Sequence, residues 1–562
     1  MGGKKRKWSL RRKALVWGAI AATILAILLF GLRGPWITPV SGVSVEMTRP
    51  PIGEGDLGLD SAYRLLLAAL TEIGRPETPS PVRNGFPGAI GKLPTTVTQV
   101  RVWSGCWTEA LEKLVHHPWP TAPPPPAPPS NANSPSMDDM AGAWDAADPH
   151  ALAIRREAPW TLEQYRKILH GLALHGRGLP LLDRALAVPA PQVPVIDAWR
   201  GTAPRQRAVG NLCAWLVAAA HVHATAGDYA AARRDLQRSL ATAALITRGG
   251  LSADHAVAWE HGGRASTAAR TIAVRFPVPV AILRRMVADF LHQADSVEPF
   301  VECVRADLLP LRNFVPIYYS SALYHPAVDA HHWGSKGGRF LRRLAAGAAP
   351  VAGSTPGKTV RNLESLYQHW VVLAQKPYSA TVQDEYDAIK KGWSPERTIL
   401  GLVLATRDPV GYHMAGGVID TTDQLHARAT THVAVLRGTA LFLAVRAYET
   451  EHGALPDSLA QLVPAYLPRL PADPFSGKPF RYLRSGVPGL PGDAWAIYSV
   501  GANCADDSGT AYIPSSFSPY CEPDLVIPSQ NYPREWQLKK PPREWHPGGR
   551  SKPRVGPRLV AI

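Results

Sequence analysis

The sequence predicts a mainly α-helical protein with one N-terminal transmembrane helix and a small C-terminal α+β module. Three observations predict this class. An uncharged apolar run follows a basic cluster near the start of the chain. The central part repeats apolar residues at steps of three and four, which is typical of helices. The last part combines a helix pattern with short alternating segments bounded by proline and glycine, which favours strands. We expect the central helices to form an array, either solenoid-like or an irregular bundle.

Composition sets the broad limits. The chain has 562 residues, of which 46% are hydrophobic, so it is long enough for several domains with a large buried core. Its net charge is +16. Seven basic residues precede residue 14, and a net +6 lies beyond residue 530, so the body between is close to neutral. Binding to nucleic acid needs a basic face that displaces counterions from phosphates, and we therefore expect no nucleic-acid partner.

Residues 14–32 are expected to form the transmembrane helix. They are nineteen residues without a charge and would span roughly 28 Å as a helix, close to the hydrocarbon thickness of a bilayer. The basic segment at residues 1–13 should stay in the cytoplasm, which places the bulk of the chain in the periplasm or outside the cell. A cleaved signal peptide usually has a shorter apolar region ending in an A-x-A-like site, and this run lacks one. We therefore predict a single-pass protein of a bacterial inner membrane, with the lipid bilayer as one partner.

Residues 33–118 read as an irregular region with one short helix. That helix is expected at residues 61–72, where Leu65, Leu66, Leu67 and Leu70 cluster on one side. Residues 119–140 form a proline-rich linker. The run at residues 123–126 is all proline and favours an extended polyproline conformation. This segment is either a loop inserted in a helical domain or a true domain boundary.

Residues 141–420 are expected to form the helical array, and its clearest unit is an antiparallel hairpin. One alanine-rich helix covers residues 211–225, the turn is Gly227-Asp228-Tyr229, and Ala232, Leu236 and Leu240 line the second helix. This hairpin resembles a tetratricopeptide repeat, with glycine at the tight turn and an aromatic residue opening the second helix. One copy is recognisable. Helical arrays of this kind usually serve as docking surfaces.

Residues 421–530 form the C-terminal module. A helix is expected over residues 425–448, with Gly453 at its C-terminal cap. Pro474 and Gly477 favour a tight turn. Strands are expected at residues 480–482, 495–501 and 524–527, and residues 503–509 form an acidic loop between the last two.

The order of these motifs resembles the globular head of the type II secretion major pseudopilins. Those heads carry a helix, a G-x-[YF]-P-like turn, a P-x-D-P-[WF]-G-x-P-[YF]-x-Y segment and an S-x-G-[AS]-D loop. Ser476 is one extra residue within the second motif. The same pattern resembles the C-terminal part of large, uncharacterised membrane-anchored bacterial proteins with helical middles. The matching positions are Gly453, Pro456, Pro471, Asp473, Pro474, Phe475, Gly477, Pro479, Phe480, Tyr482, Ser499, Gly501, Ala502 and Asn503.

The resemblance implies a calcium site, because pseudopilin heads hold calcium in that acidic loop. Calcium takes six to eight oxygen ligands, and clustered Asp and Asn side chains supply them. The implied ligands are Asn503, Asp506, Asp507 and Asp524. Asn503 stands where the family has Asp, and Cys504 interrupts the motif. The alternative is a solvated acidic turn, which a disulfide between Cys504 and Cys521 would hold in an oxidising compartment.

A second departure from the family concerns assembly. In a pseudopilin the hydrophobic helix runs directly into the head, whereas roughly 400 residues separate the two here. We therefore expect no polymerisation of the pseudopilin type. The tail at residues 531–562 is basic and proline-rich, carries Pro-Arg-Glu-Trp twice, and is expected to be disordered. It is either solvated or in contact with acidic lipid, peptidoglycan or a protein partner.

No catalytic or cofactor-binding residues are predicted. Residues 352–359 fit a relaxed nucleotide-loop pattern, but no strand pattern precedes them and Pro356 removes one backbone amide, so we expect no nucleotide. The 19 histidines include no H-E-x-x-H spacing.

These patterns favour a membrane-anchored envelope protein that acts as a non-enzymatic interaction scaffold, associated with a type II secretion or pilus-type system. The alternative is a membrane-tethered periplasmic hydrolase acting on cell-wall or peptide substrates, with its site in the helical array. A deep pocket with convergent acids, His or Ser would favour the hydrolase, and an open helix-lined groove would favour the scaffold. A third reading is a calcium-stabilised adhesion or sensing module.

Overall fold

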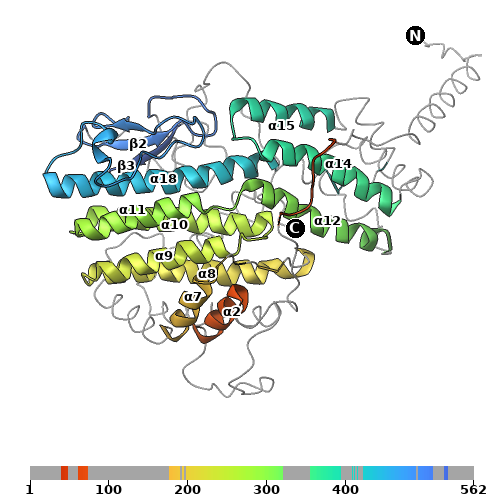
Figure 1. Ribbon diagram of the computed structural model, residues 1–562, viewed down its shortest axis with the longest axis horizontal. Coiled ribbons are helices and arrows are strands. Elements are labelled where there is room, and N and C mark those ends of the chain that lie inside the picture. Colours follow the sequence, from red (N-terminus) through yellow and green to blue (C-terminus); the bar gives the residue numbers. More distant parts are fainter. Residues whose placement is uncertain are drawn as a thin grey trace, which may run out of the picture. The chain divides into compact units, whose positions relative to one another are not determined.

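The computed structural model describes residues 40–48, 61–73, 176–189, 191, 193–194, 198–320, 355–393, 408, 411, 414–415, 422–488, 492–509 and 524–529. Three predicted segments lie outside the described residues: the transmembrane helix at 14–32, the proline-rich linker at 119–140 and the tail at 531–562. Within the described residues the protein is mainly helical with one small sheet (Figure 1). This confirms a mainly helical fold with a small sheet for the part of the chain described, while the transmembrane helix and the pseudopilin-like character of the module stay predictions.

The elements follow in chain order. The helices are α2 (Ala62–Ile73), α7 (Leu179–Leu186), α8 (Ala198–Thr225), α9 (Tyr229–Leu245), α10 (Ser252–Arg275), α11 (Val280–Asp295), α12 (Phe300–Ser320), α14 (Pro356–Ala374), α15 (Ala380–Trp393) and α18 (Thr422–His452). The 3-10 helices are η2 (Gly176–Gly178) and η3 (Leu459–Leu462), and the strands are β1 (Arg481–Leu483), β2 (Ala496–Ser499) and β3 (Leu525–Pro528).

The chain divides into two compact units. The first comprises Met1–Glu46, Asp307–Lys376 and Thr381–Asp423, and the second comprises Met47–Ala306, Pro377–Ala380 and Gln424–Ile562. In the first unit α14 buries Trp370, whose ring lies 5.4 Å from that of Tyr386 in α15. A buried Asp408 accepts hydrogen bonds from Thr359 at 2.8 Å and Asn362 at 2.9 Å, so the first two turns of α14 are tied to a neighbouring segment.

The predicted hairpin is present in the second unit. α8 ends at Thr225, Gly227 takes a positive φ of 81° in the turn, and α9 begins at Tyr229. A glycine suits this turn because a side chain at positive φ would be strained. Asp228 caps α9 by accepting the Ala231 N–H at 2.8 Å. The prediction of this hairpin is confirmed, and α8 begins earlier than expected.

One window of α8, Ala208–Thr225, is long and apolar enough to cross a membrane, but 67% of it is buried inside the protein. Its residues Leu212, Cys213 and Leu216 belong to a core shared with α2 and α7. Since the buried helix of a soluble core passes the same test, this window is weak evidence for a membrane span.

The sheet packs on α18. Its strand order is β1-β2-β3, and both pairs are antiparallel, with Tyr482 opposite Ile497 and Ile497 opposite Ile527. α18 ends at His452 and is followed by Gly453, which has φ 69° and whose N–H donates to the Glu449 carbonyl at 2.8 Å. The predicted helix, cap and three strands of the C-terminal module are therefore all present within the described residues.

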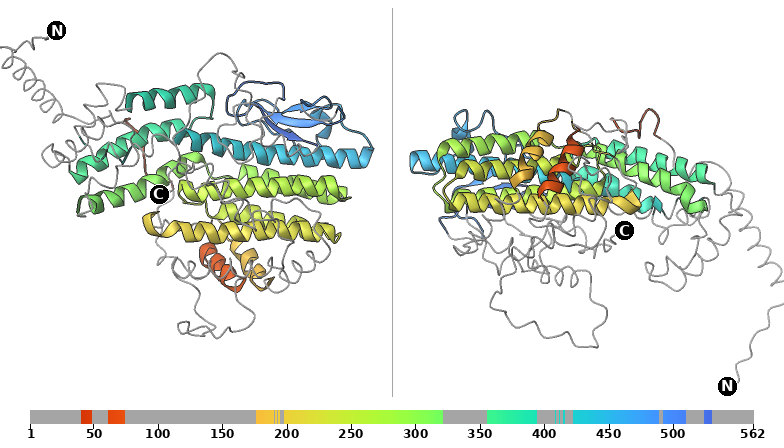
Figure 2. Two further views of the ribbon diagram at one scale, coloured as in Figure 1. Left: turned by 180° about the vertical axis from the view of Figure 1, so that it is seen from behind. Right: turned by 90° about the horizontal axis from the view of Figure 1, so that it is seen from below.

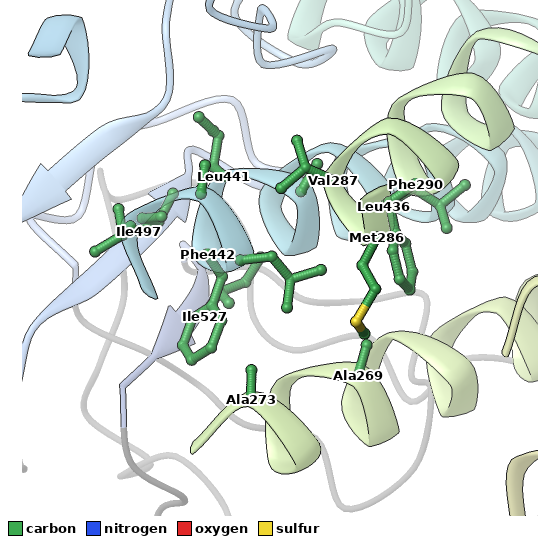
Figure 3. Packing of buried hydrophobic residues seen from close by; sticks show 14 of the residues in the cluster. Ala269, Ala273, Met286, Val287, Phe290, Leu436, Leu441, Phe442, Ile497 and Ile527 are labelled. Carbon is green, nitrogen blue, oxygen red and sulfur yellow. The ribbon is translucent and has the colours of Figure 1, made fainter. Parts of the chain in front are cut away.

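α18 is covered on more than one side by the rest of the second unit. Phe442 stacks against Trp495 with ring centroids 4.9 Å apart on the side of the sheet. Figure 3 shows side chains of α10 and α11, among them Ala269 and Met286, gathered in the same core as Leu436 and Ile527. Figures 1 and 2 show the sheet on the side of α18 away from α8 and α9. One hydrophobic core thus joins the helical array to the sheet.

The packing of the sheet against α18 can be tested by substitution of Gly438. A Cβ at this position of α18 would lie 2.1 Å from Ile527 Cδ1 and 3.6 Å from Phe480 Cε1. We expect Gly438→Ala to lower the free energy of unfolding of the full chain by about 1–3 kcal/mol, because the buried Ile527 side chain, or the strand that carries it, has to shift in a packed core. Gly357→Ala in α14 is the control, since its Cβ meets only Arg361 Nη1 at 3.7 Å, and it should be neutral or stabilising. Equal or higher stability of Gly438→Ala in urea denaturation would contradict this packing.

Candidate functional site

The motif around Asp473 builds a buried turn. The Asp473 side chain is 1% exposed and accepts hydrogen bonds from Ser499 Oγ at 2.7 Å, Ser476 Oγ at 2.8 Å and the Phe475 N–H at 3.1 Å. Gly477 has φ 68°, and its N–H bonds to the Asp473 carbonyl at 2.8 Å. Asp473 therefore fixes the proline-rich turn to the end of β2, and its oxygens are occupied by structural donors.

We expect Asp473→Ala to lower the free energy of unfolding by about 3 kcal/mol, because it leaves several buried donors without an acceptor. Asp457→Ala is the matched control. Asp457 is 71% exposed and pairs with Arg484, so its loss should change stability by about 0.5 kcal/mol or less. Denaturant titration of both variants measures the difference, and similar costs for the two would refute the role given to Asp473.

The acidic loop brings the predicted calcium ligands to one part of the module. Asn503 Nδ2 donates to Asp507 Oδ2 at 2.8 Å, and Asn503 Oδ1 accepts the Ala505 N–H at 3.0 Å. Asp506 accepts from the Tyr498 hydroxyl at 3.2 Å and pairs with Arg481 Nε at 3.2 Å.

Asp524 closes the loop from the start of β3. Its two carboxylate oxygens accept the N–H groups of Asp507 at 3.2 Å and Gly509 at 2.7 Å. The residue is 1% exposed, and burial raises the pKa of Asp524 to about 6 against the lowering effect of these two hydrogen bonds. Asp524 thus ties the acidic loop to the sheet.

The predicted calcium ligands make hydrogen bonds within the protein. Calcium needs six or more oxygens around one centre, and here the Asp507 and Asp524 oxygens accept from N–H donors. Within the described residues no group of three or more His, Cys, Asp and Glu side chains could hold a metal ion. An ion would have to displace the hydrogen bonds described above. Calcium binding at Asn503, Asp506, Asp507 and Asp524 remains a prediction from the resemblance.

The structure describes three of the five cysteines, so it tests the cysteine predictions only in part. Cys504 is half-buried in the acidic loop, with φ 56°, while Cys521 lies outside the described residues, so the pairing of the two stays a prediction. Cys213 and Cys303 are fully buried, as expected of small apolar side chains.

A buried histidine pocket lies elsewhere in the second unit, between α9, α10, α11 and α18. His255 and His432 line it together with Trp259, Gln293 and Glu298. Its cavity volume is about 10 Å³, which is near the lower limit for one water molecule. Gly262 allows the close approach of α10 to α18, since a Cβ there would lie 2.2 Å from His432 Cε1.

Both histidines are neutral. Burial lowers the pKa of His255 to about 3, with a contribution from His432, and burial lowers the pKa of His432 to about 4. The His255 ring donates to the backbone carbonyl of Thr247, while its Nε2 has no partner among the described residues. His432 Nδ1 also has none there. The His255 Nε2 is therefore an acceptor, and a single water in the cavity could donate to it and contact His432 Nδ1.

Sequence reasoning missed this pocket. The α10 sequence mixes small and polar residues and shows no clear apolar stripe, so it does not indicate which of its faces is buried. Nothing in the local pattern marks His255 or His261 as buried. His432 lies 177 positions beyond His255, and no local pattern links the two.

Comparison of the chain with known protein families, with curated proteins and with solved structures found no match. The resemblances to pseudopilin heads and to tetratricopeptide repeats therefore rest on the sequence motifs alone.

Proposed function

We propose that this protein is a membrane-anchored envelope protein that acts as a non-enzymatic interaction scaffold. The observation that supports this most is the shared core: α10, α11, α18 and the three-stranded sheet bury their apolar side chains in one cluster. Such a body holds its surface residues in fixed positions, which suits recognition of another protein. Antiparallel helix pairs of the kind seen in α8–α9 commonly present docking surfaces.

The same observation separates the proposal from a filament subunit. α18 occupies the position of the head helix in the resemblance, yet α10 and α11 of the same chain cover part of its surface. A subunit that stacks through this helix would need that surface free. A scaffold near a secretion or pilus-type system that uses its head-like unit for a single contact does not need this surface of α18 to be free.

The hydrolase alternative has less support. Its site would need convergent polar groups in a pocket that admits a cell-wall or peptide fragment. The histidine pocket has convergent polar groups, but a cavity of about 10 Å³ has no room for such a substrate.

The compartment is part of the proposal and rests on residues 14–32. A reporter that is active only outside the cytoplasm, such as alkaline phosphatase fused at the carboxyl end, should be active. Activity of a cytoplasm-specific reporter alone would refute the compartment and the proposed function together.

Partner capture tests the scaffold directly. A photo-crosslinking amino acid replaces one of three exposed residues, Arg234, Arg285 or Arg469, in the full-length protein within membranes. Leu240, which is 3% exposed, is the buried control. We expect at least one exposed position to capture the same envelope protein repeatedly and Leu240 to capture none. Equal capture from all positions, or capture from none, would overturn the proposal.

A further inference from the structure

Arg270 of α10 has an unusual environment. Its Nη1 donates to Thr439 Oγ1 at 2.8 Å and its Nη2 donates to Thr267 Oγ1 at 3.2 Å. The residue is half-buried, and no carboxylate among the described residues pairs with it. Burial lowers the pKa of Arg270 to about 10. An arginine has five N–H donors and one positive charge. The two hydroxyls accept two of the five N–H groups, and because they are neutral they do not balance the charge.

Other enclosed arginines of the same unit have an acid partner. Taking a guanidinium out of water without a counter-charge costs free energy, so such groups are normally paired. Within the described part of the chain Arg270 departs from this pattern, because its guanidinium has hydroxyl partners and no carboxylate partner. The paired examples are Arg205–Asp254, Arg233–Asp289, Arg248–Glu298 and Arg305–Glu302.

An exposed apolar side chain, Val274, lies on the same face of α10 as Arg270. Thr267, Arg270 and Val274 follow at steps of three and four along α10, so they share one face of the helix. Thr267 is exposed, and Val274 is 42% exposed, the one large hydrophobic side chain in that class among the described residues. An arginine next to an apolar contact is a frequent composition of protein interfaces.

α18 supplies the other side of this site. Thr439 contacts Arg270, and two turns further along α18 Arg446 donates to the Ala273 carbonyl at 3.5 Å. Arg446 is already paired with Glu449, and its Nε has no partner within the described part of the chain. Arg270 therefore carries one positive charge without a carboxylate partner among the described residues, and a single carboxylate would balance it.

We propose that Thr267, Arg270 and Val274 bind a protein partner through an acidic side chain, whose carboxylate pairs with Arg270 while a neighbouring apolar residue covers Val274. This rests on the proposed scaffold function and names the chemistry of one of its contacts. A carboxylate would accept the free N–H groups of Arg270 in a charge-assisted, two-pronged hydrogen bond.

Stability gives the first test. In the full-length protein without a partner, Arg270→Met should keep or raise the melting temperature, because it removes a charge that has no counter-charge. Arg205→Met is the matched control and should lower the melting temperature by several degrees, since it leaves Asp254 buried and unpaired. A drop for Arg270→Met as large as that for Arg205→Met would show that the fold itself balances Arg270, and would overturn the proposal.

Capture gives the second test. A photo-crosslinker at Thr267 in membranes should capture one envelope protein, and mass spectrometry should place the crosslink within a few residues of an Asp or Glu. Arg270→Gln should lower the yield at least tenfold, Arg270→Lys less, and Arg234→Gln, an exposed arginine of α9, should leave it unchanged. Replacement of the acid in the partner by Asn or Gln should have the same effect as Arg270→Gln.

The outcomes distinguish the two proposals. Capture from Arg234, Arg285 or Arg469 with none from Thr267 would refute the Arg270 contact and leave the scaffold standing. A crosslink to lipid, or loss of the captured protein on addition of inorganic phosphate at millimolar concentration, would show that the site binds phosphate and would overturn the carboxylate assignment.

Discussion

Acidification from pH 7.5 to pH 5.5 is expected to lower the free energy of unfolding by about 5 kcal/mol. The cause is a set of buried neutral histidines. Burial lowers the pKa of His255 to about 3 and the pKa values of His261, His426 and His432 to about 4 each, against an ordinary value of 6.5. All four side chains are under 7% exposed, so solvent screens these shifts little.

The sign follows from proton binding. Between the lowered folded values and 6.5 the unfolded chain binds more protons than the folded chain, so stability falls as the pH falls below 6.5. Each histidine contributes about 1.4 kcal/mol per pH unit in this window. Asp524 acts in the opposite direction: burial raises its pKa to about 6, so protonation of its carboxyl group favours the folded state as the pH falls toward 4. The stability gained from Asp524 is smaller than the stability lost from one histidine.

Urea denaturation of the full-length protein in detergent at pH 7.5, 6.5 and 5.5 measures this dependence. His432→Gln removes one titrating group and should reduce the loss between pH 7.5 and 5.5 by about 1.4 kcal/mol. His292→Gln, at an exposed position of α11, should leave the loss unchanged. A pH dependence that is the same in all three proteins would show that the buried histidines do not cause it.

Arg205→Met is expected to cost about 3–5 kcal/mol. Arg205 is 2% exposed and pairs with Asp254, which is fully buried, and its Nη1 donates to the Pro194 carbonyl at 3.0 Å. Asp254 also accepts from Gln206 Nε2 at 3.3 Å and from the Leu251 N–H at 3.1 Å. Removal of the guanidinium leaves a buried carboxylate that two weaker donors cannot balance.

The double variant Arg205→Met with Asp254→Leu separates the cost of an unpaired buried charge from the cost of altered packing. It should recover more than half of the loss, because no uncompensated charge remains. Arg264→Met, which breaks an i,i+4 pair with the half-exposed Glu260, should cost about 1 kcal/mol or less. Denaturation midpoints at pH 7.5 compare the three. A double variant less stable than Arg205→Met alone would show that packing, and not charge, dominates at this position.

The elements that the sequence predicted well are those with local signals. The α8–α9 hairpin is marked by Gly227 and Asp228, which meet the backbone and capping needs of a tight helix turn. The strands of the module are marked by alternation and by the turn glycine Gly477. These signals lie within a few residues of one another, so no tertiary information is needed to read them.

The features that the sequence left open depend on distant contacts. The apolar residues of α18 predict a helix with one buried face, and nothing local shows that α10 and α11 cover another part of it. The approach of His255 and His432 to one pocket, and the lack of an acid partner for Arg270 among the described residues, are likewise set by how the helices pack. The acidic loop shows the reverse case: its residues were correctly grouped, but their hydrogen bonds could not be predicted from composition.

The burial of α18 has a practical consequence for work on the C-terminal region. A fragment comprising residues 421–530 would expose the side chains that α10 and α11 cover in the intact chain, including those around Leu436 and Ala440. An apolar surface of this kind promotes aggregation. Metal-binding or crystallisation trials on that excised piece would report on a misfolded sample, so expression should begin upstream of α8.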